Sequence, residues 1–215
     1  MEYIMDPGLI ETRSMEIIGS YLDELGLELS PAAVKVYSRI IHAAGDPDYA
    51  KHIRIHPDAI TAGCAALAAG RDIYCDVEMV RTGINKRLSS YGGKVYCLIG
   101  SEETARLAKS VITRAMSAAI RQFGGQLDGV IVAIGNAPAA LFELSTLMER
   151  TGIRPALVIG VPAGFVGAAE SKALLHAASP VPYITVLGNK GGSPIAVAAL
   201  DALWYMTETV SNNVI

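Results

Sequence analysis

The chain has 215 residues, of which 51% are hydrophobic and 18% charged, and this length suits one well-buried domain. Its net charge of −3 excludes the basic surface of a general nucleic-acid binder. We find no run of about 18 apolar residues and no signal-peptide core, so we expect a cytoplasmic protein without membrane contact. Cys64, Cys75 and Cys97 lack metal or disulfide spacing, which argues against a zinc site or a disulfide framework.

The N-terminal part of the chain is rich in helix signals. Ser30 followed by Pro31 is typical of a helix start, because serine caps free N–H groups and proline suits the first helical position. A second helical pattern covers residues 57–70, from a proline to a terminating glycine. We expect one domain, 1–215, made of an N-terminal helical segment, 1–60, and a parallel-sheet core, 70–215.

Five short apolar runs follow, at residues 72–77, 94–100, 129–135, 156–161 and 182–188. The last four are nearly continuous in Val, Ile and Leu, as in strands buried on both faces. Helical patterns lie between them: one is capped by Ser101 and ends at Gly124, one runs from Pro138 to Gly152, and one begins at Pro194. This alternation predicts a three-layer α/β/α fold around a parallel sheet of about five strands.

Glycine-bearing turns follow three of these strands, at residues 135–144, 161–172 and 188–196. The carboxyl ends of parallel strands lie at one edge of a sheet, where ligands usually bind. Three turns that each lead into a helix start predict backbone N–H groups for a large ligand with several anionic groups. The alternative is that they are ordinary strand-to-helix turns. No phosphate-loop or dinucleotide spacing is present.

Six longer motifs carry a resemblance: TRSMEII (12–18), RIIHAAGDPDYA (39–50), DVEMVRTGINKRL (76–88), AIGNAPAALFEL (133–144), VIGVPAGFVGAAESK (158–172) and GNKGGSPIAVAALDAL (188–203). Together they closely resemble the precorrin-8X methylmutase family of the cobalamin pathway, over nearly the whole chain and in the right order. The resemblance implies a flavodoxin-like fold, a homodimer and an isomerase (intramolecular transferase). It implies no redox cofactor and no external methyl donor, and any cobalt would arrive inside the substrate.

The family reaction moves a methyl group on ring C of (cobalt-)precorrin-8 to the adjacent carbon, giving hydrogenobyrinic acid or its cobalt counterpart, cobyrinic acid. The family's catalytic histidine lies in an R-x-x-H element, which here is Arg39 and His42. Family substrate contacts fall on Ser14 and Arg39. A 1,5-sigmatropic shift needs electron withdrawal rather than a nucleophile, and protonation of a ring nitrogen by an imidazole supplies it. We therefore expect His42 to be the general acid.

Arg39 and His42 are three residues apart and share one helix face. A permanent cation beside the imidazole opposes its protonation unless a carboxylate neutralises the arginine. An acetate or propionate arm of the substrate would do so, and ligand binding should then promote protonation of His42. The alternative is that His42 is a hydrogen-bonded core residue, which is the commoner role of an isolated histidine on an apolar helix face.

Further substrate contacts are expected in two regions. Thr82, Gly83 and Ile84 follow the first sheet strand and would approach the macrocycle. Lys172 and Lys190 are candidate carboxylate partners, and the N–H groups of Gly191, Gly192 and Ser193 would complete an anion cradle. The alternative for both lysines is a solvated position at a helix end. Many family members have a basic residue where this chain has Asn189, so one charge contact is in doubt.

Other polar residues receive structural interpretations. Asp46 and Asp48 flank a proline and are expected to form a turn and cap a helix. His52 and His56 have a spacing that suits a metal on a helix, but Pro57 indicates a helix entry there, so no metal site is expected. His176 is likewise expected to be structural.

Two other classes of function remain as alternatives. One is a corrinoid carrier that binds without turnover, against which the intact Arg39 and His42 argue; the other is a flavin- or nucleotide-binding protein. Three segments (45–50, 83–88 and 112–119) resemble the cobalt-pathway members, so a cobalt-bearing substrate is slightly favoured. The sequence leaves open whether the product passes directly to the next enzyme of the pathway.

Overall fold

The computed structural model describes residues 5–84, 92–97, 99 and 112–212. The expected helix cap at Ser101, and part of the segment 83–88, lie outside the described residues. Among the described helices, none is long and apolar enough to cross a membrane.

Six strands form one sheet in the order β1-β6-β5-β4-β2-β3. They are β1 (Ile53–Ile55), β2 (Ile73–Cys75), β3 (Val95–Cys97), β4 (Ile131–Ile134), β5 (Leu157–Gly160) and β6 (Tyr183–Val186). Strands β2 to β6 are parallel, whereas β1 pairs with β6 in the antiparallel sense. The five predicted strand positions are confirmed in the described residues, with shorter bounds.

The sixth strand, β1, lies inside the segment 1–60 that the sequence predicted to be helical. Its three residues, Ile53, Arg54 and Ile55, are too few for a periodic pattern to reveal, and β6 supplies the pairing that makes them a strand. The expected helix entry at His52–His56 is therefore wrong. His52 ends a 3-10 turn, η1 (Pro47–Lys51), and His56 follows the strand.

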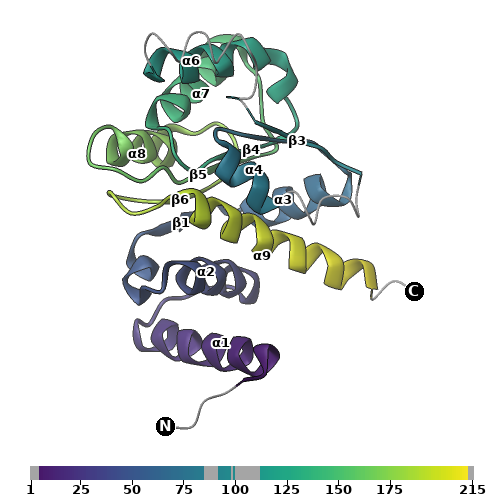
Figure 1. Ribbon diagram of the computed structural model, residues 1–215, viewed down its shortest axis with the longest axis vertical. Coiled ribbons are helices and arrows are strands. Elements are labelled where there is room, and N and C mark those ends of the chain that lie inside the picture. The colour runs from purple at the N-terminus through teal and green to yellow at the C-terminus, as the bar shows by residue number, and fades with distance from the viewer. Residues whose placement is uncertain (1–4, 85–91, 98, 100–111, 213–215) are drawn as a thin grey trace.

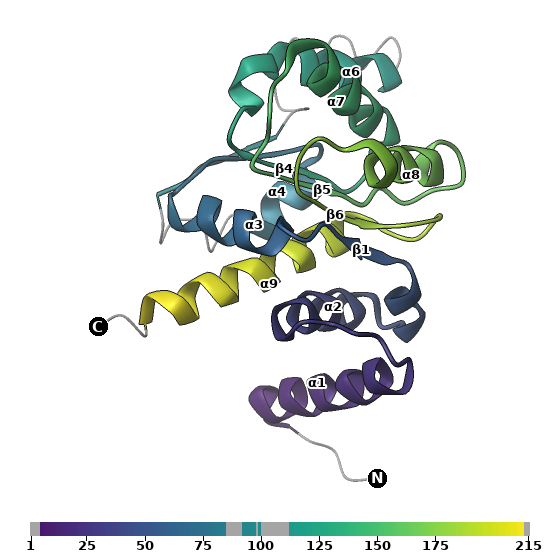
Figure 2. The same cartoon turned by 180° about the vertical axis from the view of Figure 1, so that it is seen from behind.

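Helices cover both faces of the sheet (Figures 1 and 2). One face carries α6 (Ile112–Phe123), α7 (Pro138–Thr151) and α8 (Ala168–Ala178), and a 3-10 turn, η4 (Gly124–Leu127), follows α6. The other face carries α3 (Ala59–Ala68), α4 (Glu78–Ile84) and α9 (Ser193–Asn212). The buried apolar residues accordingly form two clusters, one on each side of the sheet. This is the expected three-layer α/β/α arrangement.

Two further helices extend the α9 side of the molecule. α2 (Pro31–Ala44) packs on α9, and α1 (Pro7–Glu24) packs on α2, farther from the sheet (Figure 1). The Ser30 side chain accepts a hydrogen bond from Ala33 N, and Gly45 ends α2 with a φ of 63°. The helix start at Ser30 is as predicted. The N-terminal helices therefore form a layer of their own, in which α2 packs on α9 and also reaches edge strand β1, where the Tyr37 hydroxyl donates to Ile53 O at 3.1 Å.

Candidate active site

Two hollows follow one another along the line where α2 meets α9. The first, here called the α1 hollow, has a volume of 420 Å³; the second, the α4 hollow, has a volume of 300 Å³. The α1 hollow is lined by Met15, Gly19, Val34, Lys35, Ser38, Arg39, Ala202, Tyr205 and Met206. The α4 hollow is lined by Ala43, Met79, Gly83, Ser193, Pro194, Val197, Ala198 and Asp201. Both therefore have largely apolar walls.

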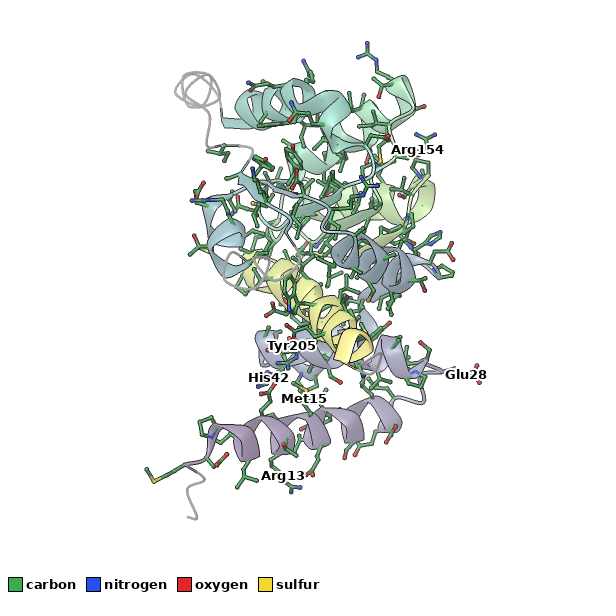
Figure 3. The ribbon with its side chains drawn as sticks, turned by 90° about the vertical axis from the view of Figure 1, so that its right-hand side faces the viewer. Arg13, Met15, Glu28, His42, Arg154 and Tyr205 are labelled. Atoms are coloured by element: carbon green, nitrogen blue, oxygen red, sulfur yellow. The ribbon has the colours of Figure 1, made fainter. Side chains whose placement is uncertain are left out.

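His42 lies on α2 between residues that line the two hollows, although it is not part of the lining of either. Its neighbour Ala43 lines the α4 hollow and Arg39, one turn earlier, lines the α1 hollow. Figure 3 shows the side chains of His42, Met15 and Tyr205 in the space between α1 and α9. The His42 side chain is exposed in the last turn of α2. Within the described part of the chain it makes no hydrogen bond, so the alternative of a bonded core histidine is wrong.

Arg39 is held from two sides. Its Nη2 lies 2.6 Å from Glu11 Oε1 on α1, and its guanidinium carbon lies 4.4 Å from the centre of the Tyr205 ring. A carboxylate therefore neutralises Arg39, but it comes from Glu11 of the protein and not from a substrate arm as predicted. Ser14 follows Glu11 by one turn, is half-buried, and donates its hydroxyl to Ile10 O at 2.8 Å.

The residues 82–84 lie on helix α4 and not at a strand end. Thr82 and Gly83 are exposed, and Gly83 lines the α4 hollow. A Cβ on Gly83 would lie 2.6 Å from Val197 Cγ2, so only glycine lets α4 approach α9 this closely. Ile84, with 3% exposure, belongs to the core, which corrects its assignment as a substrate contact.

The carboxyl edge of the sheet is organised differently from the prediction. Asp76, directly after β2, is buried and accepts hydrogen bonds from the N–H groups of Gly135, Asn136 and Ala137, at 3.1, 2.7 and 2.8 Å. Burial raises the pKa of Asp76, and the three N–H donors oppose this rise. The N–H groups of the first glycine-bearing turn are thus occupied by a protein carboxylate.

The other two turns bind each other and η1. Gly164 N donates to Asn189 O, Gly192 N to Val161 O, and Gly191 N to the Tyr49 hydroxyl, at 3.1, 2.7 and 3.2 Å. The predicted anion cradle is therefore wrong for the N–H groups of Gly191 and Gly192, which already have protein acceptors. They join three loops into one rigid edge. Ser193 is buried, with 5% exposure, and lines the α4 hollow at the start of α9.

Lys190 forms ion pairs with both predicted turn residues. Its Nζ lies 2.6 Å from Asp46 Oδ2 and 2.8 Å from Asp48 Oδ2. These hydrogen bonds raise the pKa of Lys190, and the bond from Lys190 lowers the pKa of Asp48 well below its usual range. Asp46 also caps η1 as predicted, accepting a bond from Asp48 N. The charge of Lys190 is therefore already balanced within the protein.

Lys172 is fully buried, which rules out a solvated position. Its ammonium donates to Lys190 O at 2.5 Å, and burial lowers its pKa to about 8. Lys172 therefore supports the main chain of the third turn from behind and offers no surface charge to a carboxylate. Its connection to Lys190 had no signal in the sequence, because the two residues belong to different strand-to-helix units.

The remaining histidines have the structural places expected of them. His52 Nε2 lies 3.3 Å from Asp48 Oδ2, and His56 Nδ1 accepts a bond from Asp58 N. His176 Nδ1 lies 2.6 Å from the Tyr183 hydroxyl. In the described part of the chain, no group of three or more His, Cys, Asp or Glu side chains could hold a metal ion.

The α1 and α4 hollows together form a groove between α2 and α9. This α/β protein therefore has its candidate site in its helical layers, where apolar walls, an exposed imidazole and an arginine suit a large carboxylated ligand. Comparison with known proteins gives the family. Residues 9–206 match the family model described as precorrin-8X methylmutase. The chain belongs to this family, and it is therefore an isomerase of cobalamin biosynthesis.

Individual relatives agree with this assignment. The chain is 44% identical over 181 residues to the cobalt-precorrin-8 methylmutase of Leptospira interrogans, covering 80% of this chain and 82% of the relative. It is 39% identical to the precorrin-8X methylmutase of Pseudomonas aeruginosa, covering 94% and 97%. The solved structure of the precorrin-8X methylmutase from Thermus thermophilus superposes with a TM-score of 0.84 at 39% identity, covering 94% and 97%.

Proposed function

We propose that this protein moves a methyl group on ring C of precorrin-8 to the adjacent carbon, and that a cobalt-bearing substrate is slightly favoured. The observation that carries the proposal is the exposed His42 side chain, which has no partner among the described residues and lies between Arg39 and Ala43, each of which lines an apolar hollow. The relative from Leptospira interrogans, named as a cobalt-precorrin-8 methylmutase, supports the preference for cobalt.

In the proposed mechanism, His42 in its imidazolium form donates a proton or a strong hydrogen bond to a ring nitrogen. Electron density then leaves the conjugated system, the bond from the methyl group to its first carbon breaks, and a bond to the neighbouring carbon forms. The proton returns to His42 afterwards, so the reaction consumes no proton and no external methyl donor. General-acid assistance of this kind contributes roughly 10²–10⁴ in rate.

The groove walls give the substrate its place. A flat macrocycle can lie against the apolar side chains of the α4 hollow, including Met79 and Val197, close to the exposed Gly83. Arg39 would bind one carboxylate arm of the substrate. Ser14 lies one helical turn from Glu11, which forms an ion pair with Arg39 in this structure. In this arrangement, His42 approaches the ring from the end of α2.

The flavodoxin-like character expected from the resemblance is supported by strand order. Counted from β2, the five parallel strands are arranged 2-1-3-4-5, which is the order of that doubly wound fold. The order changes direction between β2 and β4, where such folds bind a nucleotide or flavin. Here the Asp76 carboxylate occupies the N–H groups at that point, which argues against the flavin or nucleotide alternative.

The expected homodimer is supported by an apolar strip on α1. Ile10, Ile17 and Tyr21 share one flank of α1, beside the face that buries Ile18 and Leu22, and they are 43%, 45% and 41% exposed. A second copy of the chain would cover them. Ile17→Lys should then give a monomer in sedimentation velocity, whereas Thr12→Lys, which adds the same charge on another side of α1, should leave the dimer intact. Equal behaviour of the two variants would refute α1 as the interface.

A cytoplasmic location and direct hand-off of the product to the next enzyme stay predictions of the sequence. Fractionation of cells that express a tagged protein tests the first. Co-elution of the next pathway enzyme, only in the presence of the product, tests the second.

The function is tested by the visible absorbance spectrum after mixing cobalt-precorrin-8, or its metal-free form, with protein. Wild type should produce the corrin spectrum, and His42→Ala should bind the substrate but convert it about 10²–10⁴ times more slowly. His56→Ala, at the far end of β1, is the control and should convert it normally. Binding without conversion by wild type would favour the carrier, and equal conversion by His42→Ala would refute the role of His42.

A further inference from the structure

The α1 hollow contains groups that the proposed mechanism does not use. We propose that it is the subsite for one carboxylate side arm of the substrate, and that Glu11 fills the carboxylate position while the site is empty. This inference rests on the proposed function, since the ligand is a macrocycle with carboxylate arms. It adds Ser38 and Tyr205 to the binding residues and makes α1 part of the site.

The environment of Arg39 already has the form of a carboxylate site. Tyr205 lies against the guanidinium, 4.4 Å from its carbon, and Glu11 Oε1 lies 2.6 Å from Nη2. A guanidinium that is held against an aromatic ring presents its N–H donors in a fixed plane, which suits carboxylate recognition. Glu11 thus marks the position that a ligand carboxylate would take.

Ser38 supplies the second, independent observation. The residue is 7% exposed and lines the hollow, and its side-chain hydroxyl makes no hydrogen bond with any described residue. Buried hydroxyl groups without a partner are uncommon, because their desolvation is not compensated. Lys35, one turn before Arg39, also lines the hollow and adds a second positive charge. A ligand carboxylate would give Ser38 a hydrogen-bond acceptor and would face both cations.

Displacement of Glu11 should be easy. The Glu11 side chain is 47% exposed and that of Arg39 is 26% exposed, so their ion pair is partly solvated and contributes little to stability. Helix α1 itself buries only Ile18 and Leu22. A small movement of the Glu11 side chain, or of this helix turn, would open Arg39 to the ligand.

If Glu11 competes with the ligand, its removal should strengthen binding. We would measure the dissociation constant of the product, hydrogenobyrinic acid, by visible absorbance titration. Glu11→Gln should lower this constant about two- to fivefold, which is the range that a partly exposed ion pair contributes. Glu16→Gln is the matched control: it removes the same charge from α1, where Glu16 pairs with the exposed Arg13 at 2.9 Å, and should change nothing.

A double-mutant cycle makes the test specific to Arg39. In an Arg39→Gln background, Glu11→Gln should no longer affect product binding, because the guanidinium for which Glu11 and the ligand carboxylate compete is absent. Ser38→Ala should weaken product binding several-fold in the Glu11→Gln background. A dissociation constant that rises or stays unchanged in Glu11→Gln overturns the proposal, as does an equal gain in the Arg39→Gln background. Substrate conversion is measured with the same preparations. If wild type does not convert the substrate, the proposed function fails; if it converts the substrate but Glu11→Gln does not bind the product more tightly, only this inference fails.

Discussion

The carboxyl edge of the sheet and the groove between α2 and α9 both collect charged groups, but they treat them in opposite ways. At the sheet edge, Asp76 binds three N–H groups, Lys190 pairs with two aspartates, and Lys172 supports a main-chain carbonyl. In the groove, His42 and Ser38 have no hydrogen-bond partner among the described residues, and Arg39 is held by a partly solvated carboxylate.

The difference shows which polar groups are available to a ligand. Polar groups at the edge already have partners within the protein, whereas the side chains of His42 and Ser38 have none among the described residues and are therefore available to a ligand. The edge is where an open parallel sheet ordinarily binds its ligand. In this protein the loops at that edge are bonded to one another and to η1, and they fix the start of α9, which forms one wall of the groove.

Substitution at the edge should therefore act on stability, and Gly191 should show the largest effect. Its φ is +150°, and a Cβ would collide with the carbonyl oxygen of Val161. Gly191→Ala should lower the free energy of unfolding by about 3 kcal/mol or more, through backbone strain and steric overlap. Urea denaturation measures this. Gly125→Ala, which meets no atom within 4 Å, should change it little, and equal effects of the two would contradict the rigid edge.

Lys172 should give a pH-dependent effect of similar size. Burial lowers its pKa from 10.5 to about 8, so the unfolded chain binds more protons than the folded chain between these values. The stability contribution of Lys172 is thus complete above pH 10.5 and is lost as the pH falls through about 8. The gap corresponds to about 3 kcal/mol.

In urea denaturation from pH 7 to 10, the stability of wild type should therefore rise relative to that of Lys172→Met. Lys94→Met, at an exposed lysine, should follow wild type in parallel across the same range. A constant difference between wild type and Lys172→Met would show that Lys172 keeps an ordinary pKa in the folded protein.

The ion pairs of Lys190 should have a smaller effect, confined to acid pH. Lys190 lowers the pKa of Asp48, so its contribution is present above the ordinary carboxyl pKa of about 4 and is lost as the pH falls below it. Lys190→Met should therefore be less stable than wild type at pH 6, and this difference should shrink progressively as the pH falls below about 4 in thermal unfolding. A difference that persists at low pH would mean that Lys190 acts through packing.

His42 should give the smallest effect on stability. Because it is exposed and has no partner in the described residues, His42→Gln should change the free energy of unfolding by no more than about 0.5 kcal/mol. Differential scanning calorimetry measures this in parallel with the turnover assay. A larger loss of stability would place His42 with the edge residues and weaken the contrast between the two regions.

The sequence was sufficient for the elements that local physics decides. Ser30, Pro138 and Gly152 begin or end helices where predicted, because capping and positive φ depend on a few neighbouring residues. The continuous apolar runs predicted the parallel strands, because a strand that is buried on both faces consists of consecutive apolar residues. The resemblance gave the family and the expected roles of Arg39 and His42, and their three-residue spacing placed them on one helix face.

Tertiary structure decided what each charged side chain does. β1 exists because β6 pairs with it, and Lys190 is neutralised by aspartates more than 140 residues away in sequence. Burial turned Lys172 from an expected surface cation into an internal support, and α1 brought Glu11 to Arg39. Desolvation and ion pairing depend on which segments meet in space, so local sequence patterns carry little information about them. Helix and strand periodicity depends on neighbours along the chain, and there the sequence alone was enough.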